Sequence, residues 1–169
     1  MSARLRGRLC GFTLIELLVT LVIISIIISM ATLSLGNNEA RQVQDTAGTL
    51  TALIELAKEE ALFNGQEMGI AFWQGGYVFY RQENLQWVPI VDDNEFRPRD
   101  LPEGLWIAVY LDGLDVDLPG NPEQRKRPQV YIMSSGEITP FEAKIGTDNT
   151  QVTLKADALG NLAYVSPPS

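Results

Sequence analysis

The clearest chemical signal in this sequence is a carboxylate inside a long apolar run. Glu16 is followed by nineteen residues, Leu17 to Leu35, that include no charged residue and no proline. A carboxylate in the hydrocarbon of a bilayer costs on the order of 2.5–3.5 kcal/mol, and less near the interface. We therefore expect Glu16 to pair with another group.

The composition excludes the commonest catalytic groups. The chain has no histidine, and its single cysteine, Cys10, precedes the apolar run. Ser-His-Asp catalysis, Cys-His catalysis and the usual zinc sites are therefore excluded. Asp112, Asp115 and Asp117 lie close together in sequence, and carboxylate oxygens are calcium ligands, but their spacing differs from that of an EF-hand loop. We expect a solvated acidic loop there. We also expect no catalytic residue, cofactor or metal in the chain, although the spacing alone leaves cation binding by the three aspartates open.

The apolar run is predicted to be a membrane helix over residues 12–35. At about 1.5 Å per residue, the uncharged part is roughly 30 Å long, the thickness of a bilayer core. Three arginines precede it, and the first charges after it are Glu39 and Arg41. This asymmetry predicts a cytoplasmic N-terminus and an outward chain. An ordinary secretory signal would have a shorter apolar region and a small-residue cleavage site.

The junction before this run resembles a known processing signal. Gly11-Phe12-Thr13-Leu14-Ile15-Glu16, after a basic leader, resembles the cleavage and methylation signal of the type IV pilin superfamily, which includes the pseudopilins of type II secretion. The resemblance implies that residues 1–11 are a leader, that a prepilin peptidase cuts between Gly11 and Phe12, and that the Phe12 amine is methylated. It also implies that Glu16 meets such an amine on a neighbouring subunit.

The rest of the chain predicts a second helical segment and an antiparallel β domain. Gly36 is the expected position of a bend or break, and Asn64-Gly65 is a good helix stop. Between them, over 36–65, apolar residues recur at spacings of three and four, which is typical of one buried helix face. These residues are Val43, Ala47, Leu50, Ile54, Ala57 and Ala61. The fold class is therefore predicted to be α+β: a long N-terminal helix packed on an antiparallel sheet or sandwich formed by 66–169.

Short alternating segments predict the strands of this domain. Gly75-Gly76 indicates a hairpin, and Pro89 indicates an edge strand. Residues 105–111 are apolar on both faces, which predicts a strand covered on both sides, and 112–128 read as a long polar connection. Strands are predicted at 68–72, 77–81, 85–91, 105–111, 130–133, 138–141, 152–156 and 162–165.

A second, shorter resemblance points within the superfamily. Residues 130–141, VYIMSSGEITPF, resemble the late strand-turn-strand of the H-type minor pseudopilins and the related FimT-like minor pilins. The resemblance implies a structural minor pseudopilin of the type II secretion pseudopilus. Such a protein assembles through its N-terminal helix and supports export of folded proteins from the periplasm across the outer membrane.

The same resemblance implies the location and the partners. We expect a single-pass protein of the bacterial inner membrane with a periplasmic globular domain. Its partners would be other major and minor pseudopilins, prepilin peptidase and membrane lipid, with secreted cargo as a further candidate. The net charge of −8 argues against nucleic acid, because phosphate binding relies on lysine and arginine. Two alternatives stay open: a FimT-like minor pilin of a type IV pilus, and a membrane-anchored enzyme that uses carboxylates.

Overall fold

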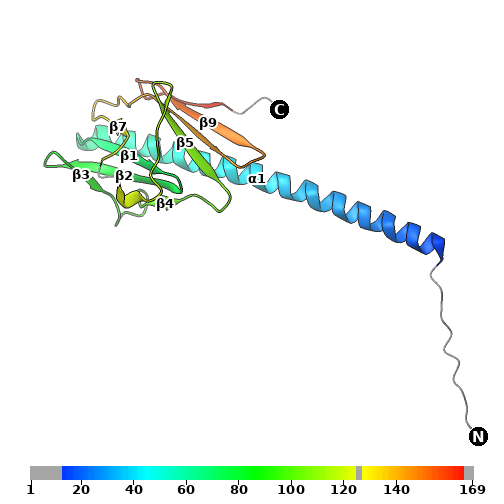
Figure 1. Ribbon diagram of the computed structural model, residues 1–169. Helices are drawn as coiled ribbons and strands as arrows, with labels where there is room; N and C mark the ends of the chain where they lie inside the picture. Colours follow the sequence, from blue (N-terminus) through cyan, green and yellow to red (C-terminus); the bar gives the residue numbers. More distant parts are fainter. Residues whose placement is uncertain (1–12, 125–126, 166–169) are drawn as a thin grey trace, which may run out of the picture. The chain divides into compact units, whose positions relative to one another are not determined.

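The computed structural model describes residues 13–124 and 127–165, and the side chains of residues 29–37 fall outside this description. The chain divides into two compact units, residues 1–38 and 39–169. One helix, α1 (Leu14–Asn64), contributes to both units, and every strand belongs to the second (Figure 1). Gly11 and Phe12, the residues of the predicted cleavage site, lie outside the described residues.

The helix α1 is continuous, which corrects the break expected at Gly36. A glycine inside a helix costs only about 1 kcal/mol relative to alanine, so one glycine between strong helix formers does not end the helix. The predicted stop at Asn64-Gly65 is confirmed. Gly65 adopts φ 61, in the left-handed region that glycine enters without a Cβ penalty.

The first sheet follows directly after α1. Its strand order is β3-β2-β1-β7, β4 also pairs with β2, and all of these pairs are antiparallel. Trp73 pairs with Gly76, which confirms the predicted hairpin, and Pro89 ends an edge strand, as predicted. The strands are β1 (Met68–Trp73), β2 (Gly76–Glu83), β3 (Gln86–Pro89), β4 (Arg99–Asp100) and β7 (Val130–Ile132).

The second sheet has the order β10-β9-β8-β5-β6 and is also antiparallel. The strand predicted at 138–141 is wrong: β8 starts at Phe141, and Ile138 makes only an isolated bridge to Ile132. Pro140 explains the shift, because it has no N–H for a ladder. The strands are β5 (Trp106–Leu111), β6 (Leu114–Asp115), β8 (Phe141–Gly146), β9 (Gln151–Ala156) and β10 (Leu162–Val165).

Two predictions about the middle of the chain need correction. The strand β5 is buried on one face only, at Ile107 and Val109, while Trp106 and Tyr110 are half-buried. Large aromatic side chains keep part of their surface in water even when they pack well. The predicted polar connection contains β6 and a short 3₁₀ helix, η1 (Pro122–Gln124).

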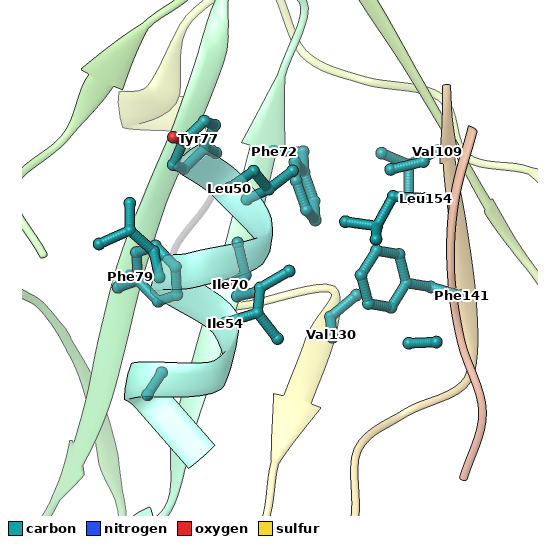
Figure 2. Close-up of a cluster of buried hydrophobic side chains, with 14 of the residues drawn as sticks. Leu50, Ile54, Ile70, Phe72, Tyr77, Phe79, Val109, Val130, Phe141 and Leu154 are labelled. Atoms are coloured by element: carbon teal, nitrogen blue, oxygen red, sulfur yellow. The ribbon is translucent and has the colours of Figure 1, made fainter. Parts of the chain in front are cut away.

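The core of the 39–169 unit lies between α1 and the two sheets. Leu50 and Ile54 of α1 face Ile70 and Phe79 of the first sheet on one side and Leu154 of the second on the other (Figure 2). The predicted buried face is confirmed, because all six residues of that face have 0% exposure: Val43, Ala47, Leu50, Ile54, Ala57 and Ala61. The α+β fold class is confirmed as well.

Polar contacts between distant parts of the sequence join α1 to the second sheet. The carboxylate of Glu39 accepts hydrogen bonds from Thr147 Oγ1 at 3.2 Å and Asn149 Nδ2 at 3.0 Å. Lys58 Nζ pairs with Glu55 at 3.0 Å and donates to the backbone oxygen of Gly160. The turns β8–β9 and β9–β10 are therefore both held against the helix.

Candidate assembly site

The first turn of α1 is built around Thr13 and Glu16. The backbone N–H of Glu16 donates to the carbonyl oxygen of Thr13 at 3.1 Å and to its Oγ1 at 3.4 Å, and Leu17 N donates to the same carbonyl oxygen at 3.2 Å. Thr13 therefore caps the helix, with Glu16 at the third helical position. A negative side chain is favourable there because it faces the positive end of the helix dipole.

Sequence reasoning did not identify the role of Thr13. The signal was available, because a threonine followed three residues later by a glutamate has the spacing of a capping box. The predicted assembly residue Glu16 is thus fixed in the first turn by the residue that starts the helix. Its place relative to Phe12 lies outside the described residues.

The apolar surface around and after Glu16 is not buried by the other residues that the structure describes. All twelve large apolar side chains of residues 14–28 are exposed, from 45% for Ile24 to 81% for Leu14. A contiguous apolar surface of this kind marks a place for lipid or for another apolar surface. They are Leu14, Ile15, Leu17, Leu18, Val19, Leu21, Val22, Ile23, Ile24, Ile26, Ile27 and Ile28.

Hydroxyl side chains in this segment are satisfied within the helix. Thr20 Oγ1 donates to Glu16 O at 2.6 Å, and Ser25 Oγ donates to Leu21 O at 2.8 Å. These bonds one turn back allow polar side chains in an apolar helix without unpaired donors.

Among the residues that the structure describes, no helix is long and apolar enough to cross a membrane. The predicted span over 12–35 includes residues that lie outside that description. It therefore stays a prediction.

The three aspartates of the predicted acidic loop do not form a site in the structure. Asp112, at φ 51, and Gly113, at φ 77, make the two-residue turn between β5 and β6. Such a turn requires positive φ at both positions, which favours this pair of residue types. Asp115 is exposed in β6. Across residues 13–124 and 127–165, no group of three or more His, Cys, Asp or Glu residues could hold a metal ion.

A hollow lies on the outer face of the first sheet. Trp73 and Tyr80 are buried there in a small apolar cluster, and the half-buried Trp87 packs against it. The hollow has a volume of about 600 Å³, and burial raises the pKa of the Tyr80 hydroxyl. It offers apolar contact and lacks a pair of acids for catalysis among its described lining residues. These are Val78, Tyr80, Trp87, Pro89, Val91, Pro98, Pro122 and Glu123.

Family models match both parts of the chain. The model described as "Prokaryotic N-terminal methylation motif" matches residues 7–32, and the model described as "Type II transport protein GspH" matches residues 46–160. The first match covers the predicted processing site and most of the predicted span. The second covers most of the 39–169 unit.

Curated relatives and solved structures agree with these models. The type II secretion system protein H of Pseudomonas aeruginosa is 34% identical over 159 residues, covering 87% of this chain and 90% of that protein. The Escherichia coli protein of the same name is 30% identical, covering 85% and 86%. The structure of the minor pseudopilin EpsH of Vibrio cholerae has a TM-score of 0.64 and 25% identity, covering 76% of this chain and 98% of that chain.

Proposed function

Because the chain belongs to the GspH family, the H-type minor pseudopilins of type II secretion, we propose that it joins the pseudopilus through the first half of α1. One observation carries the proposal: residues 14–28 present an apolar surface that the other described residues do not bury, and Glu16 lies in its first turn. The role is structural. The 39–169 unit contains the second half of α1, and the first half contributes the exposed apolar side chains that would contact lipid and other subunits.

The proposal includes processing of the N-terminus. A prepilin peptidase removes residues 1–11, and the new amine of Phe12 is methylated. The match of residues 7–32 to the methylation motif supports this step. Removing three arginines takes the charge of the chain from −8 to −8 − 3 = −11, before the new amine is counted. Before cleavage those arginines hold the N-terminus in the cytoplasm, with the 39–169 unit in the periplasm.

Glu16 then provides the specific contact. Its carboxylate pairs with the Phe12 amine of a neighbouring subunit as the helices meet. The attraction between two opposite charges is stronger in surroundings of low dielectric constant than in water, and an unpartnered charge there is costly. The first turn supports this role, since the Thr13 cap fixes where the Glu16 side chain leaves the helix.

Other major and minor pseudopilins are the principal partners in this proposal. Prepilin peptidase, inner-membrane lipid and secreted cargo complete the set, and nucleic acid is not part of it. The FimT-like alternative is less favoured, because the curated relatives cited above are type II secretion proteins.

The carboxylate-enzyme alternative is also less favoured. A carboxyl group that acts as a general acid near neutral pH needs a raised pKa. Where the pKa of a described carboxyl group is clearly shifted, at Asp93, Glu142 and Asp157, it is lowered by hydrogen bonds or by neighbouring lysines.

Replacing Glu16 by alanine tests the assembly step. Glu16→Ala should insert and be cleaved normally, because it makes the helix more apolar and leaves the Gly11-Phe12 junction intact. Crosslinking of the membrane-inserted chain to other pseudopilins should fall, and secretion should fall with it. Glu39→Ala is a matched control, because Glu39 contacts its own chain. If Glu16→Ala crosslinks and secretes like the wild type, Glu16 is not an assembly contact.

Mass spectrometry of the mature N-terminus tests the processing step independently. The expected chain begins at Phe12 with a methylated amine. A protein that begins at Met1, or that is cut near Ala31, would contradict the proposed cleavage. The Glu16→Ala experiment tests the assembly step independently of that result.

A further inference from the structure

One buried donor on the 39–169 unit has no partner within the described chain. Nε of Arg99 is the only buried side-chain nitrogen or oxygen atom without a hydrogen bond among the described residues. The Arg99 Nη2 donates to the carbonyl oxygen of Glu95 at 3.0 Å, and no described acidic side chain pairs with this guanidinium. Buried polar atoms are almost always paired, so the described residues leave the hydrogen-bonding capacity of this guanidinium incompletely used.

Arg99 is held firmly in its position beside α1. It lies in β4 directly opposite Tyr77 of β2, and opposed residues of an antiparallel pair share one face of a sheet. Tyr77 belongs to the core cluster that faces α1. The close approach of β4 depends on Gly76, because a Cβ at residue 76 would collide with the carbonyl oxygen of Arg99 and the ring of Trp73.

A second arginine completes a hollow at this place. The hollow has a volume of about 280 Å³. A water molecule takes up about 30 Å³ in the liquid, so the hollow has room for one side chain. Two arginines and one aspartate are among its lining residues. The lining residues are Thr46, Thr49, Tyr77, Arg97, Pro98, Arg99, Asp100 and Pro102.

The chemistry of the hollow favours an anion. Both threonine hydroxyls already donate, from Thr46 to Gln42 O and from Thr49 to Asp45 O, each at 2.8 Å. The charged donors that remain in the lining are the two guanidinium groups, and the Tyr77 hydroxyl is a neutral one. A guanidinium presents a planar pair of N–H groups, which matches the two oxygens of a carboxylate.

We propose that Arg97 and Arg99 form a receptor for a carboxylate side chain of a neighbouring subunit. This rests on the proposed function, because the neighbour is another pseudopilin and the hollow is lined by α1, the helix that carries assembly. Charge complementarity supports a protein carboxylate as the occupant. The chain itself carries 21 acidic residues against 13 basic ones, so its two arginines here are complementary to an acidic surface such as a second copy would present.

A carbodiimide crosslink tests the proposal in the full chain. Arg97→Lys places a primary amine in the hollow. In membranes that contain all the pseudopilins, a carbodiimide joins this amine to an adjacent carboxylate as an amide, and the reagent takes up the water as a urea. We expect mass spectrometry to find Lys at position 97 joined to an Asp or Glu of another subunit. Arg81→Lys is the matched control: Arg81 pairs with Glu83 at 2.5 Å, so its crosslink should stay within the chain.

A charge reversal provides the second measurement. Arg97→Glu should reduce formaldehyde capture of other pseudopilins by about tenfold or more, because it puts a like charge against the incoming carboxylate. Arg81→Glu should leave capture unchanged. Arg97 is exposed, so its variants are not expected to unfold the domain.

Three results would overturn the inference. They are a crosslink from position 97 only to Asp100 of the same chain, a yield equal to that of the Arg81 control, and undiminished capture by Arg97→Glu. An undiminished capture without any crosslink to protein would mean that the hollow holds only a small free anion.

The wild-type chain separates failure of the proposed function from failure of the inference. If the wild-type chain itself captures no pseudopilin, the proposed function fails and the inference fails with it. If the wild type and Arg97→Glu capture other pseudopilins equally, the inference alone fails.

Discussion

The two halves of α1 are both rich in apolar residues, but their apolar side chains differ in burial. Leu21 in the first half is 63% exposed, whereas Leu50 in the second half is fully buried. In the second half, apolar residues form one stripe with polar residues between them, so the helix has a single side to pack. In the first half they surround the helix, and the described part of the chain provides nothing to cover them.

The comparison shows that spacing, rather than residue type, decides what an apolar side chain does. Burying a large aliphatic side chain is favourable by about 1.5–3 kcal/mol. In the second half this stabilisation belongs to the fold of the 39–169 unit. In the first half it becomes available only when lipid or another subunit covers the helix.

The largest expected effect comes from shortening a leucine in each half. Leu50→Ala should lower the free energy of unfolding of the 39–169 unit by about 2–5 kcal/mol, because it leaves a cavity in the core. Leu21→Ala should change it by less than about 0.5 kcal/mol. Urea unfolding of the full chain in detergent, followed by tryptophan fluorescence, measures both, since all three tryptophans lie in this unit. Equal losses in the two variants would contradict the division of α1.

A second substitution tests the sheet against which the buried half packs. The side-chain amide of Gln129 accepts from Phe72 N at 2.8 Å and donates to Phe72 O at 3.0 Å, where β7 no longer pairs with β1. Gln129→Ala should cost about 2 kcal/mol, because it leaves two buried backbone groups unpaired. Gln151→Ala, at an exposed position, is the control in the same unfolding experiment. A neutral Gln129→Ala would mean that water replaces the amide without loss.

Acid should weaken the 39–169 unit by a smaller amount. Lys155, at 2.8 Å, and Lys144, at 3.6 Å, lower the pKa of Glu142. Because the folded pKa lies below the unfolded value of about 4.3, the stabilisation is present above pH 4.3 and is lost as the pH falls through the folded pKa. For a surface cluster this amounts to about 0.2–1 kcal/mol. Unfolding experiments across this pH range should show a smaller acid loss in Glu142→Gln than in the wild type, and identical profiles would contradict the assignment.

The smallest expected effect on the fold is that of removing the first half. A fragment of residues 38–169 should stay folded as a monomer, with a free energy of unfolding close to that of the full chain. Its charge is −8 − 2 = −10, because residues 1–37 contribute three arginines and one glutamate. We also expect that it does not retain DNA at physiological salt. Circular dichroism and filter binding are sufficient, and micromolar, salt-sensitive DNA binding would favour the DNA-uptake class of minor pilin.

Local sequence signals predicted much of this structure. The stripe from Val43 to Ala61 has the period of one helix face, and Gly75-Gly76 has the residue types of a tight hairpin turn. Pro89 marks an edge because it lacks a ladder N–H. The junction of Gly11 and Phe12 with Glu16 indicated the family, although Gly11 and Phe12 lie outside the described residues.

The remaining features depend on contacts between distant residues. The strand β4 is only two residues long and exists because Gly76 lets Arg99 approach β2. The side-chain amide of Gln129 makes the hydrogen bond to Phe72 that the backbone of a strand residue would otherwise make, and no local pattern indicates this. The arginine pair was not predicted as a site for the same reason, since its hollow requires α1 and β4 to come together.

The polar contacts of Glu39 and Lys58 have a consequence for the timing of folding. Glu39 contacts Asn149, 110 residues later, and Lys58 contacts Gly160, 102 residues later. Contacts that close such long loops form slowly, because the loop entropy is lost before the contact is made. During synthesis the helix is made first and these turns almost last. The side of α1 that packs against the second sheet therefore stays uncovered until nearly every residue has emerged, and a chain that stops before Gly160 leaves that side open to chaperones and proteases.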